Sequence, residues 1–196
     1  MIRKGVLCVL LAACLMTGCE QKVNYIEQGT LKLEEKQYGE AVSSFKQSLE
    51  MEENPAEAYR GLGMAYYEQQ DYQAAREAFQ NVIDHGGEVT VVLYNLMGVC
   101  SMHLEDMNGA LDAFQKGIAL AGENGQRETA SESAGTDQTA GGQDLSEVVK
   151  EMKFNEIVCY EKLRDWQSAK EKAEAYTAEY PDDKDAGKEA QFLKTR

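Results

Sequence analysis

Apolar and aromatic residues recur along this chain at helical spacing around a glycine that keeps the same neighbours. In three segments, a tyrosine lies four residues before the glycine, an alanine twelve residues after it and a phenylalanine four residues further on. The three sets are Tyr25, Gly29, Ala41 and Phe45; Tyr59, Gly63, Ala75 and Phe79; and Tyr94, Gly98, Ala110 and Phe114. Successive glycines are 34 and 35 residues apart, the length of one helix-turn-helix repeat. The pattern predicts an all-α array of stacked helical hairpins.

The register divides the chain into four repeat units and a final helix. Residues 22–121 hold the first three units, and a more divergent fourth unit spans 145–181. In that unit Ile157 occupies the glycine position, whereas Trp166 falls where the first two units have a tyrosine. We expect 182–196 to form a capping helix, because the last unit of such an array needs a cover for its core face.

The segment 122–144 interrupts the pattern between the third and fourth units. It contains no aromatic residue and no Leu, Ile, Val or Met, so we expect a disordered, low-complexity insert. The residues after it are too few for a separate stable array, which needs about three repeats. Lengthening a connection to this extent costs only about 1.5 kcal/mol in closure entropy. The sequence therefore favours one continuous array with a looped-out insert.

The second unit shows the repeat most fully. Its pattern comprises Tyr59, Leu62, Gly63 and Tyr66 on the first helix, then Tyr72, Ala75, Phe79 and Ile83 on the second. This pattern resembles the tetratricopeptide repeat. The resemblance implies a right-handed α-solenoid of about four helix-turn-helix repeats plus a C-terminal capping helix, acting as a non-enzymatic scaffold or adaptor for protein binding.

In the tetratricopeptide family, the first helices of the repeats line a concave groove that binds extended or helical peptides. The groove positions of the family correspond here to Ile26, Thr30, Leu33, Arg60, Met64, Tyr67, Asn95, Val99, Met102, Phe154, Val158 and Glu161. Most are apolar or aromatic, which suits a partner helix or hydrophobic segment more than a charged tail. The family's carboxylate clamp is not expected, because Ile26 and Thr30 replace its first lysine and asparagine.

The N-terminus has the pattern of an export signal. Arg3 and Lys4 precede an uncharged run over 5–19, which is shorter than the roughly 20 apolar residues of a membrane span. The run ends in the letters LMTGC, which resemble the lipobox of bacterial lipoproteins, although Met16 departs from the usual residue. We expect 1–18 to be a signal peptide and Cys19 to carry the lipid.

Cys14 is the alternative lipidation site, since the letters LAAC before it match the lipobox more closely. Cys19 is preferred because cleavage at Cys14 would leave a short apolar run and expose further apolar residues. The mature protein would then be tethered through 19–21 to the outer, extracytoplasmic face of the cell membrane, where two or more acyl chains give stable anchoring.

The net charge of the chain is −14, and −16 without the two basic residues of the signal. Such a charge repels phosphate backbones, so nucleic acid is a poor partner. An unidentified protein or peptide is the expected partner, with no cofactor, metal or small-molecule substrate.

Two alternatives to a general scaffold stay open. One is an assembly factor, similar to the pilotin-like or outer-membrane assembly lipoproteins of this family. The other is a thiol-dependent enzyme that uses Cys100 and His103, which lie three residues apart on one predicted helix. The register instead places Cys100 and Cys159 in equivalent packing positions, about 10 Å apart in neighbouring units and too distant for a disulfide. We expect both to be buried thiols.

Overall fold

The computed structural model describes residues 23–130 and 145–196, and within 124–130 it defines the backbone helix alone. These residues form helices joined by short turns, without a β-strand in either described range. The helices are α1 (Tyr25–Glu34), α2 (Tyr38–Glu50), α3 (Pro55–Glu68), α4 (Tyr72–Asp84), α5 (Val91–His103), α6 (Met107–Ala130), α7 (Leu145–Lys162), α8 (Trp166–Glu179) and α9 (Lys184–Leu193). The prediction of an all-α array is confirmed.

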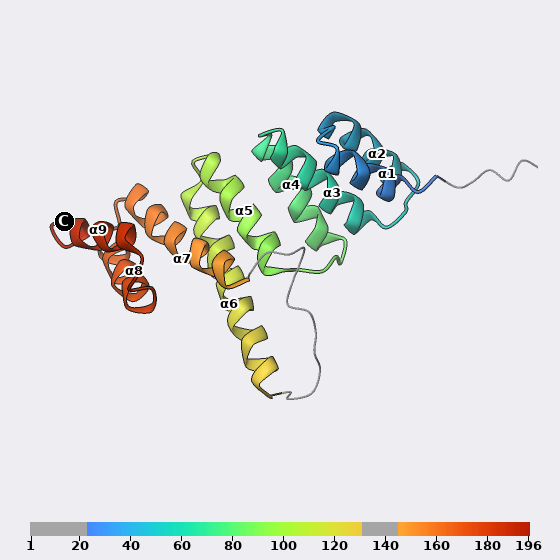
Figure 1. The fold of residues 1–196 in the computed structure, drawn as a ribbon. Helices are drawn as coiled ribbons and strands as arrows, with labels where there is room; N and C mark the ends of the chain where they lie inside the picture. Colours follow the sequence, from blue (N-terminus) through green and yellow to red (C-terminus); the bar gives the residue numbers. More distant parts are fainter. Residues whose placement is uncertain (1–22, 131–144) are drawn as a thin grey trace, which may run out of the picture.

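The helices follow one another as hairpins in an elongated row (Figure 1). The hairpins are α1–α2, α3–α4, α5–α6 and α7–α8, and α9 packs on α8 at the end. First helices of neighbouring hairpins also touch, α1 against α3 and α5 against α7. The architecture is therefore a helical solenoid with a terminal cap.

All four hairpins use the same turn between their two helices. One residue of each turn has a left-handed backbone, with φ near +60°: Lys36, Gln70, Glu105 and Arg164. In three units an aspartate then caps the second helix by accepting a hydrogen bond from a backbone N–H three residues on: Asp71, Asp106 and Asp165. A common turn gives hairpins of different sequence a common geometry.

At each recurring glycine a phenylalanine ring lies against the backbone, where any other residue would have its side chain. A Cβ added at Gly63 would overlap the Phe79 ring, and one added at Gly98 would overlap the Phe114 ring. Phe45 fills the equivalent space between α1 and α3, against Gly29 and Gly61. All three phenylalanines are buried. The glycine of the sequence motif is therefore needed because it lacks a side chain and leaves room for the ring.

The fourth unit reverses this pairing of small and large residues. Ile157 takes the glycine position and Ala173 the phenylalanine position, and both are buried in the same cluster. The large side chain is on the first helix here and the small one on the second. Ile157 of α7 therefore fills the space between the helices that a phenylalanine of the second helix fills in the other units. A compensating exchange of volume of this kind preserves a core.

The segment between units three and four differs from the prediction in its first part. Helix α6 is 24 residues long and continues to Ala130, so 122–130 is helical where a disordered loop was expected. The remainder of the insert, 131–144, lies outside the described residues. Unit four still packs directly on unit three, because Val148 and Met152 of α7 share a cluster with Phe114 of α6.

The cap helix α9 places the carboxyl group of Glu189 beside that of Glu161 on α7. Helix α9 is buried against α8 through Ala186, Ala190 and Leu193. Glu161 of α7 has a buried Oε1 without a hydrogen-bond partner among the described residues. Burial, followed by the Glu189 carboxyl group of α9, raises the pKa of Glu161 to about 7.

We predict that Glu161→Gln stabilises the protein in a pH-dependent way. The folded-state pKa lies above the ordinary value near 4.5. The ionised carboxylate therefore costs little stability below that value, and the cost grows as the pH rises toward 7. After allowance for partial exposure, Glu161→Gln should gain roughly 1–2 kcal/mol in unfolding free energy at pH 8 and much less at pH 4.5.

Urea unfolding followed by circular dichroism at the two pH values measures this gain. Glu174→Gln, at an exposed position of α8, is the matched control and should show no such difference. An equal effect of Glu161→Gln at both pH values would contradict the raised pKa.

Candidate functional site

The predicted binding positions lie on the first helices of the hairpins, which contact each other between α1 and α3 and between α5 and α7. We call the surface made by α1, α3, α5 and α7 the first-helix face. Of the predicted residues, Thr30 alone is exposed, and all the others are half-buried. Residues of this kind have a part of their surface in the core and a part available to a partner.

In unit one the predicted positions are largely structural. Ile26 and Leu33 pack against the cluster that contains Phe45. The Thr30 hydroxyl donates a hydrogen bond of 2.9 Å to the carbonyl oxygen of Ile26. Thr30 is therefore a solvent-facing position on a helix whose apolar side is already packed.

In unit two the predicted positions join neighbouring elements. The Arg60 guanidinium donates a hydrogen bond of 2.8 Å to the carbonyl oxygen of Glu88, in the segment before α5. Met64 and Tyr67 pack against the cluster that contains Phe79 and Leu93. Burial is the main cause that raises the pKa of Tyr67 above its ordinary value, so its hydroxyl is a neutral polar group on this face.

In unit three the predicted positions reach toward unit four. The Asn95 side chain donates a hydrogen bond of 3.5 Å from Nδ2 to Glu151 Oε2 of α7. Its Oδ1 is buried and has no hydrogen-bond partner among the described residues. Val99 and Met102 pack against the cluster shared by units three and four. The Asn95 oxygen is closed to solvent, so a bound chain can satisfy it only after the half-buried side chain turns outward.

In unit four Phe154 lies beside a small hollow. Its ring packs edge-on against Tyr176, with 5.7 Å between the ring centroids, and Val158 is half-buried one turn further along α7. The hollow has a volume of about 320 Å³ and is lined by Phe154, Tyr176, Glu147, Lys150, Glu151, Asp183 and Asp185. Of these residues Phe154 alone was among the binding positions predicted from the sequence.

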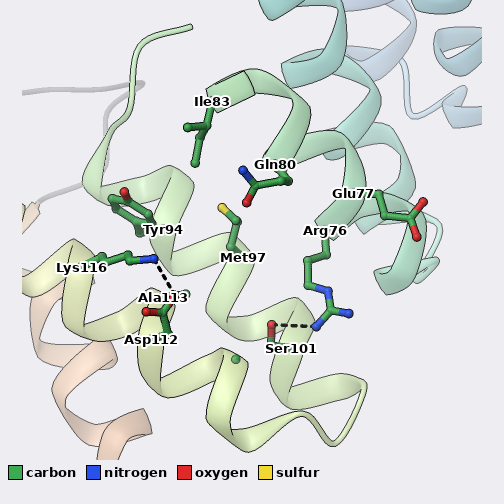
Figure 2. A pocket seen from close by; sticks show the side chains of 11 residues that line it. Arg76, Glu77, Gln80, Ile83, Tyr94, Met97, Ser101, Asp112, Ala113 and Lys116 are labelled. Carbon is green, nitrogen blue, oxygen red and sulfur yellow. Dashed lines mark hydrogen bonds and ion pairs between the residues drawn. The ribbon is translucent and has the colours of Figure 1, made fainter. Parts of the chain in front are cut away.

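A second cavity was not predicted from the sequence. It has a volume of about 390 Å³ and lies between α4, α5 and α6, with Ile83, Tyr94 and Met97 among its lining residues, as Figure 2 shows. The connection from α4 to α5 spans 85–90, whereas the one from α2 to α3 spans 51–54. The longer connection falls within the 35-residue spacing between Gly63 and Gly98. It joins units two and three, between which this cavity lies.

Of the four charged residues that line this cavity, Arg76, Asp112 and Lys116 form ion pairs within the protein, and Glu77 accepts a hydrogen bond from the Gln73 amide. The Arg76 guanidinium lies 2.7 Å from Asp106 Oδ2, and Lys116 Nζ lies 2.7 Å from Asp112 Oδ2. A charged ligand would have to compete with these pairs. The cavity is therefore a less favourable binding surface than the first-helix face.

The two thiols of the described residues lack the environment of a nucleophile. Cys100 and Cys159 are free and fully buried, as predicted. Burial raises the pKa of Cys100 to about 12 and that of Cys159 to about 11, which keeps both protonated at neutral pH. The His103 ring stacks on the Tyr72 ring with 3.9 Å between centroids, so its contact is aromatic packing.

In residues 23–130 and 145–196, no group of three or more His, Cys, Asp or Glu side chains is arranged to hold a metal ion. No helix within the same ranges is long and apolar enough to cross a membrane.

Comparisons with solved structures identify proteins of the same fold. YrrB, described as a tetratricopeptide repeat protein with an unusual peptide-binding site, matches with a TM-score of 0.64 and 21% identity over 86% of this chain and 74% of its own. MamA matches with a TM-score of 0.65 and 17% identity over 86% of this chain and 78% of its own. A tetratricopeptide repeat protein from Parabacteroides merdae matches with a TM-score of 0.57 and 12% identity, over 89% of this chain and 59% of its own.

Sequence comparison points to the same family. No curated protein matches the chain. Two models of the tetratricopeptide repeat match it, one over residues 26–87 and one over 154–183. The first match covers the hairpins α1–α2 and α3–α4, and the second covers most of α7–α8. With the hairpin geometry and the structural matches, these show that the chain contains tetratricopeptide repeats in both parts that the models match.

Proposed function

We propose that this protein is a non-catalytic scaffold that binds a peptide or helix of a partner protein along the first-helix face. The observation that carries the proposal is Asn95, whose side-chain oxygen is buried on this face without a donor. Satisfying such a group recovers a desolvation cost of about 1–3 kcal/mol. A backbone N–H of a bound segment, or a polar side chain, supplies the missing donor once the half-buried Asn95 side chain turns outward.

The apolar content of the face supports the same partner chemistry. Met64, Tyr67, Val99 and Met102 are half-buried, so each can bury more surface when a partner docks. Burial of apolar area gives roughly 25 cal/mol per Å², and methionine side chains adapt to different partner shapes. An amphipathic helix or an extended apolar segment fits such a surface.

The fold itself favours binding over catalysis. Tetratricopeptide arrays generally serve as protein-interaction modules. YrrB, one of the proteins with a similar structure, is described as having a peptide-binding site. The fully buried, protonated thiols of this chain offer no support for a thiol-dependent reaction.

We further propose that the scaffold is a lipoprotein, held through Cys19 on the extracytoplasmic face of the cell membrane. The support is the sequence of the N-terminal segment, which lies outside the described residues. Helix α1 begins at Tyr25, six residues after Cys19, and six extended residues span about 20 Å. A lipid at Cys19 would therefore keep the first hairpin close to the membrane surface.

The groove proposal predicts a crosslink that depends on the first-helix face. A photoreactive amino acid at the exposed Thr30, in the full chain in cells, should yield a discrete partner adduct. The same probe at Gln47, exposed on the second helix α2, should not. Val99→Glu should lower the Thr30 adduct at least tenfold, because it places a charge where apolar surface is buried.

Asn95→Ala tests separately whether the side-chain oxygen of Asn95 takes part in binding. It should also weaken the Thr30 adduct, since the donor from the partner loses its acceptor. Circular dichroism melts of each variant control for folding. An adduct that persists at full strength in folded Val99→Glu and Asn95→Ala proteins would overturn the proposed binding face.

The anchor proposal predicts a covalent lipid on one cysteine. Growth of bacterial cells with an alkyne-bearing fatty acid, followed by coupling to a fluorophore, should label the wild-type chain and Cys14→Ser equally. Cys19→Ser should lose the label. If Cys19→Ser retains the label and Cys14→Ser loses it, Cys14 is the anchor; an unlabelled wild-type chain would rule the lipid out.

A further inference from the structure

The two ends of the array expose side chains that an interior unit would cover. Helix α1 packs against α2 and α3 at one end, and α9 packs against α8 at the other, as the row in Figure 1 shows. Each end helix therefore has a face without a packed helix of the described chain against it. The terminal units of repeat arrays need a polar outer face to remain separate, so the chemistry of these two faces matters.

The outer face of α1 is acidic around an exposed leucine. The Leu31 side chain is 52% exposed, although this helix has a well-packed opposite side at Gly29. Glu27 and Glu34 are also exposed, and they lie four residues before and three residues after Leu31. This spacing puts the three side chains on one stripe of the helix, in the order acidic, apolar, acidic.

The opposite end is basic around exposed aromatic side chains. Phe192 is 43% exposed and Trp166 is 37% exposed. The Arg196 guanidinium lies over both rings, 4.6 Å from the Phe192 centroid and 5.7 Å from the Trp166 centroid. Lys184, Lys188 and Phe192 are spaced four residues apart on α9, so basic and aromatic groups share one side of the cap.

The charge of this end is unlike that of the chain. Residues 184–196 contain four basic and two acidic side chains, whereas the whole chain carries a net charge of −14. Lys188 is paired with Asp185 at 2.7 Å, but both side chains are largely exposed, and such a pair is easily exchanged for another partner. The cap thus offers a basic and aromatic surface on an otherwise acidic protein.

We propose that the two ends bind each other in different copies, so that the α9 face of one copy docks head to tail on the α1 face of the next. Leu31 of one copy meets Phe192 and Trp166 of the other, and Glu27 and Glu34 meet the basic residues of the cap. The apolar contact supplies most of the affinity, while the opposite charges fix the direction and disfavour the head-to-head and tail-to-tail arrangements.

A contact between two different faces has a defined consequence for assembly. Each copy keeps one unused end after it binds, so the contact adds further copies in an open row unless the geometry closes a ring. The contact uses Glu27, Leu31 and Glu34 on the outer side of α1, so the part of the first-helix face on α3, α5 and α7 stays available. The proposal concerns a different surface from the proposed function, and neither rests on the other.

Cysteine crosslinking in cells tests the contact in the full-length chain. Leu31→Cys and Phe192→Cys are introduced singly and together, and a short bismaleimide is added; the parent chain sets the background, because Cys100 and Cys159 are buried. The double variant should give a ladder of multimers. Two single variants with different tags should crosslink when expressed together, and neither should crosslink to itself. Ser43→Cys with Glu174→Cys, exposed on α2 and α8, is the matched control pair and should give no ladder.

Charge reversal tests the direction of docking. Glu27→Lys with Glu34→Lys should reduce the ladder to the level of the control pair, and so should Lys184→Glu with Lys188→Glu. All four changes in one chain should restore the ladder, because reversed ends again face each other. Self-crosslinking of a single variant, a ladder unaffected by charge reversal, or no ladder at all would overturn the proposal. The Thr30 adduct should be unchanged throughout, which separates failure here from failure of the proposed function.

Discussion

The contact between a glycine on the first helix and a phenylalanine on the second governs the geometry of this protein. Because Gly63 and Gly98 lack side chains, the rings of Phe79 and Phe114 lie directly against the backbone of the partner helix. The distance between the two helices is thereby fixed, and with it the spacing of successive units. The fourth unit keeps the constraint with the sizes exchanged, through Ile157 and Ala173. Close packing, rather than one residue type, is what the repeat requires.

This constraint determines which side chains remain for function. Once the rings occupy the space within each hairpin, the predicted positions on the first helices are left half-buried, apart from the exposed Thr30. Tyr67 and Val99 pack on the core with one part of their surface, and Asn95 joins units three and four through Glu151. Side chains packed in this way are held in place before a partner docks, which lowers the entropic cost of the proposed binding.

The local regularities of the sequence were sufficient to predict the array but not its irregular parts. The glycine register placed Cys100 and Cys159 in buried positions, since it reports packing directly. It did not predict that α6 continues to Ala130, because a segment without large apolar residues can extend an existing helix when its Ala, Glu and Gln residues favour helical backbone. The cavity beside Met97 depends on how far the connection 85–90 separates two units. The orphan oxygen of Asn95 depends on the side chains of α7, which lie far away in the sequence.

The most direct test of this account is the free energy of unfolding of Gly98→Ala, measured by urea denaturation. The added methyl group meets the Phe114 ring, whereas the same change at Gly187 meets nothing within 4 Å. We expect Gly98→Ala to cost about 1–3 kcal/mol, Gly187→Ala to stabilise by about 0.5–1 kcal/mol, and Phe114→Leu to reduce the cost of Gly98→Ala in a double-mutant cycle. Equal effects at the two glycines, or no coupling between Gly98 and Phe114, would contradict the claim that this contact sets the hairpin.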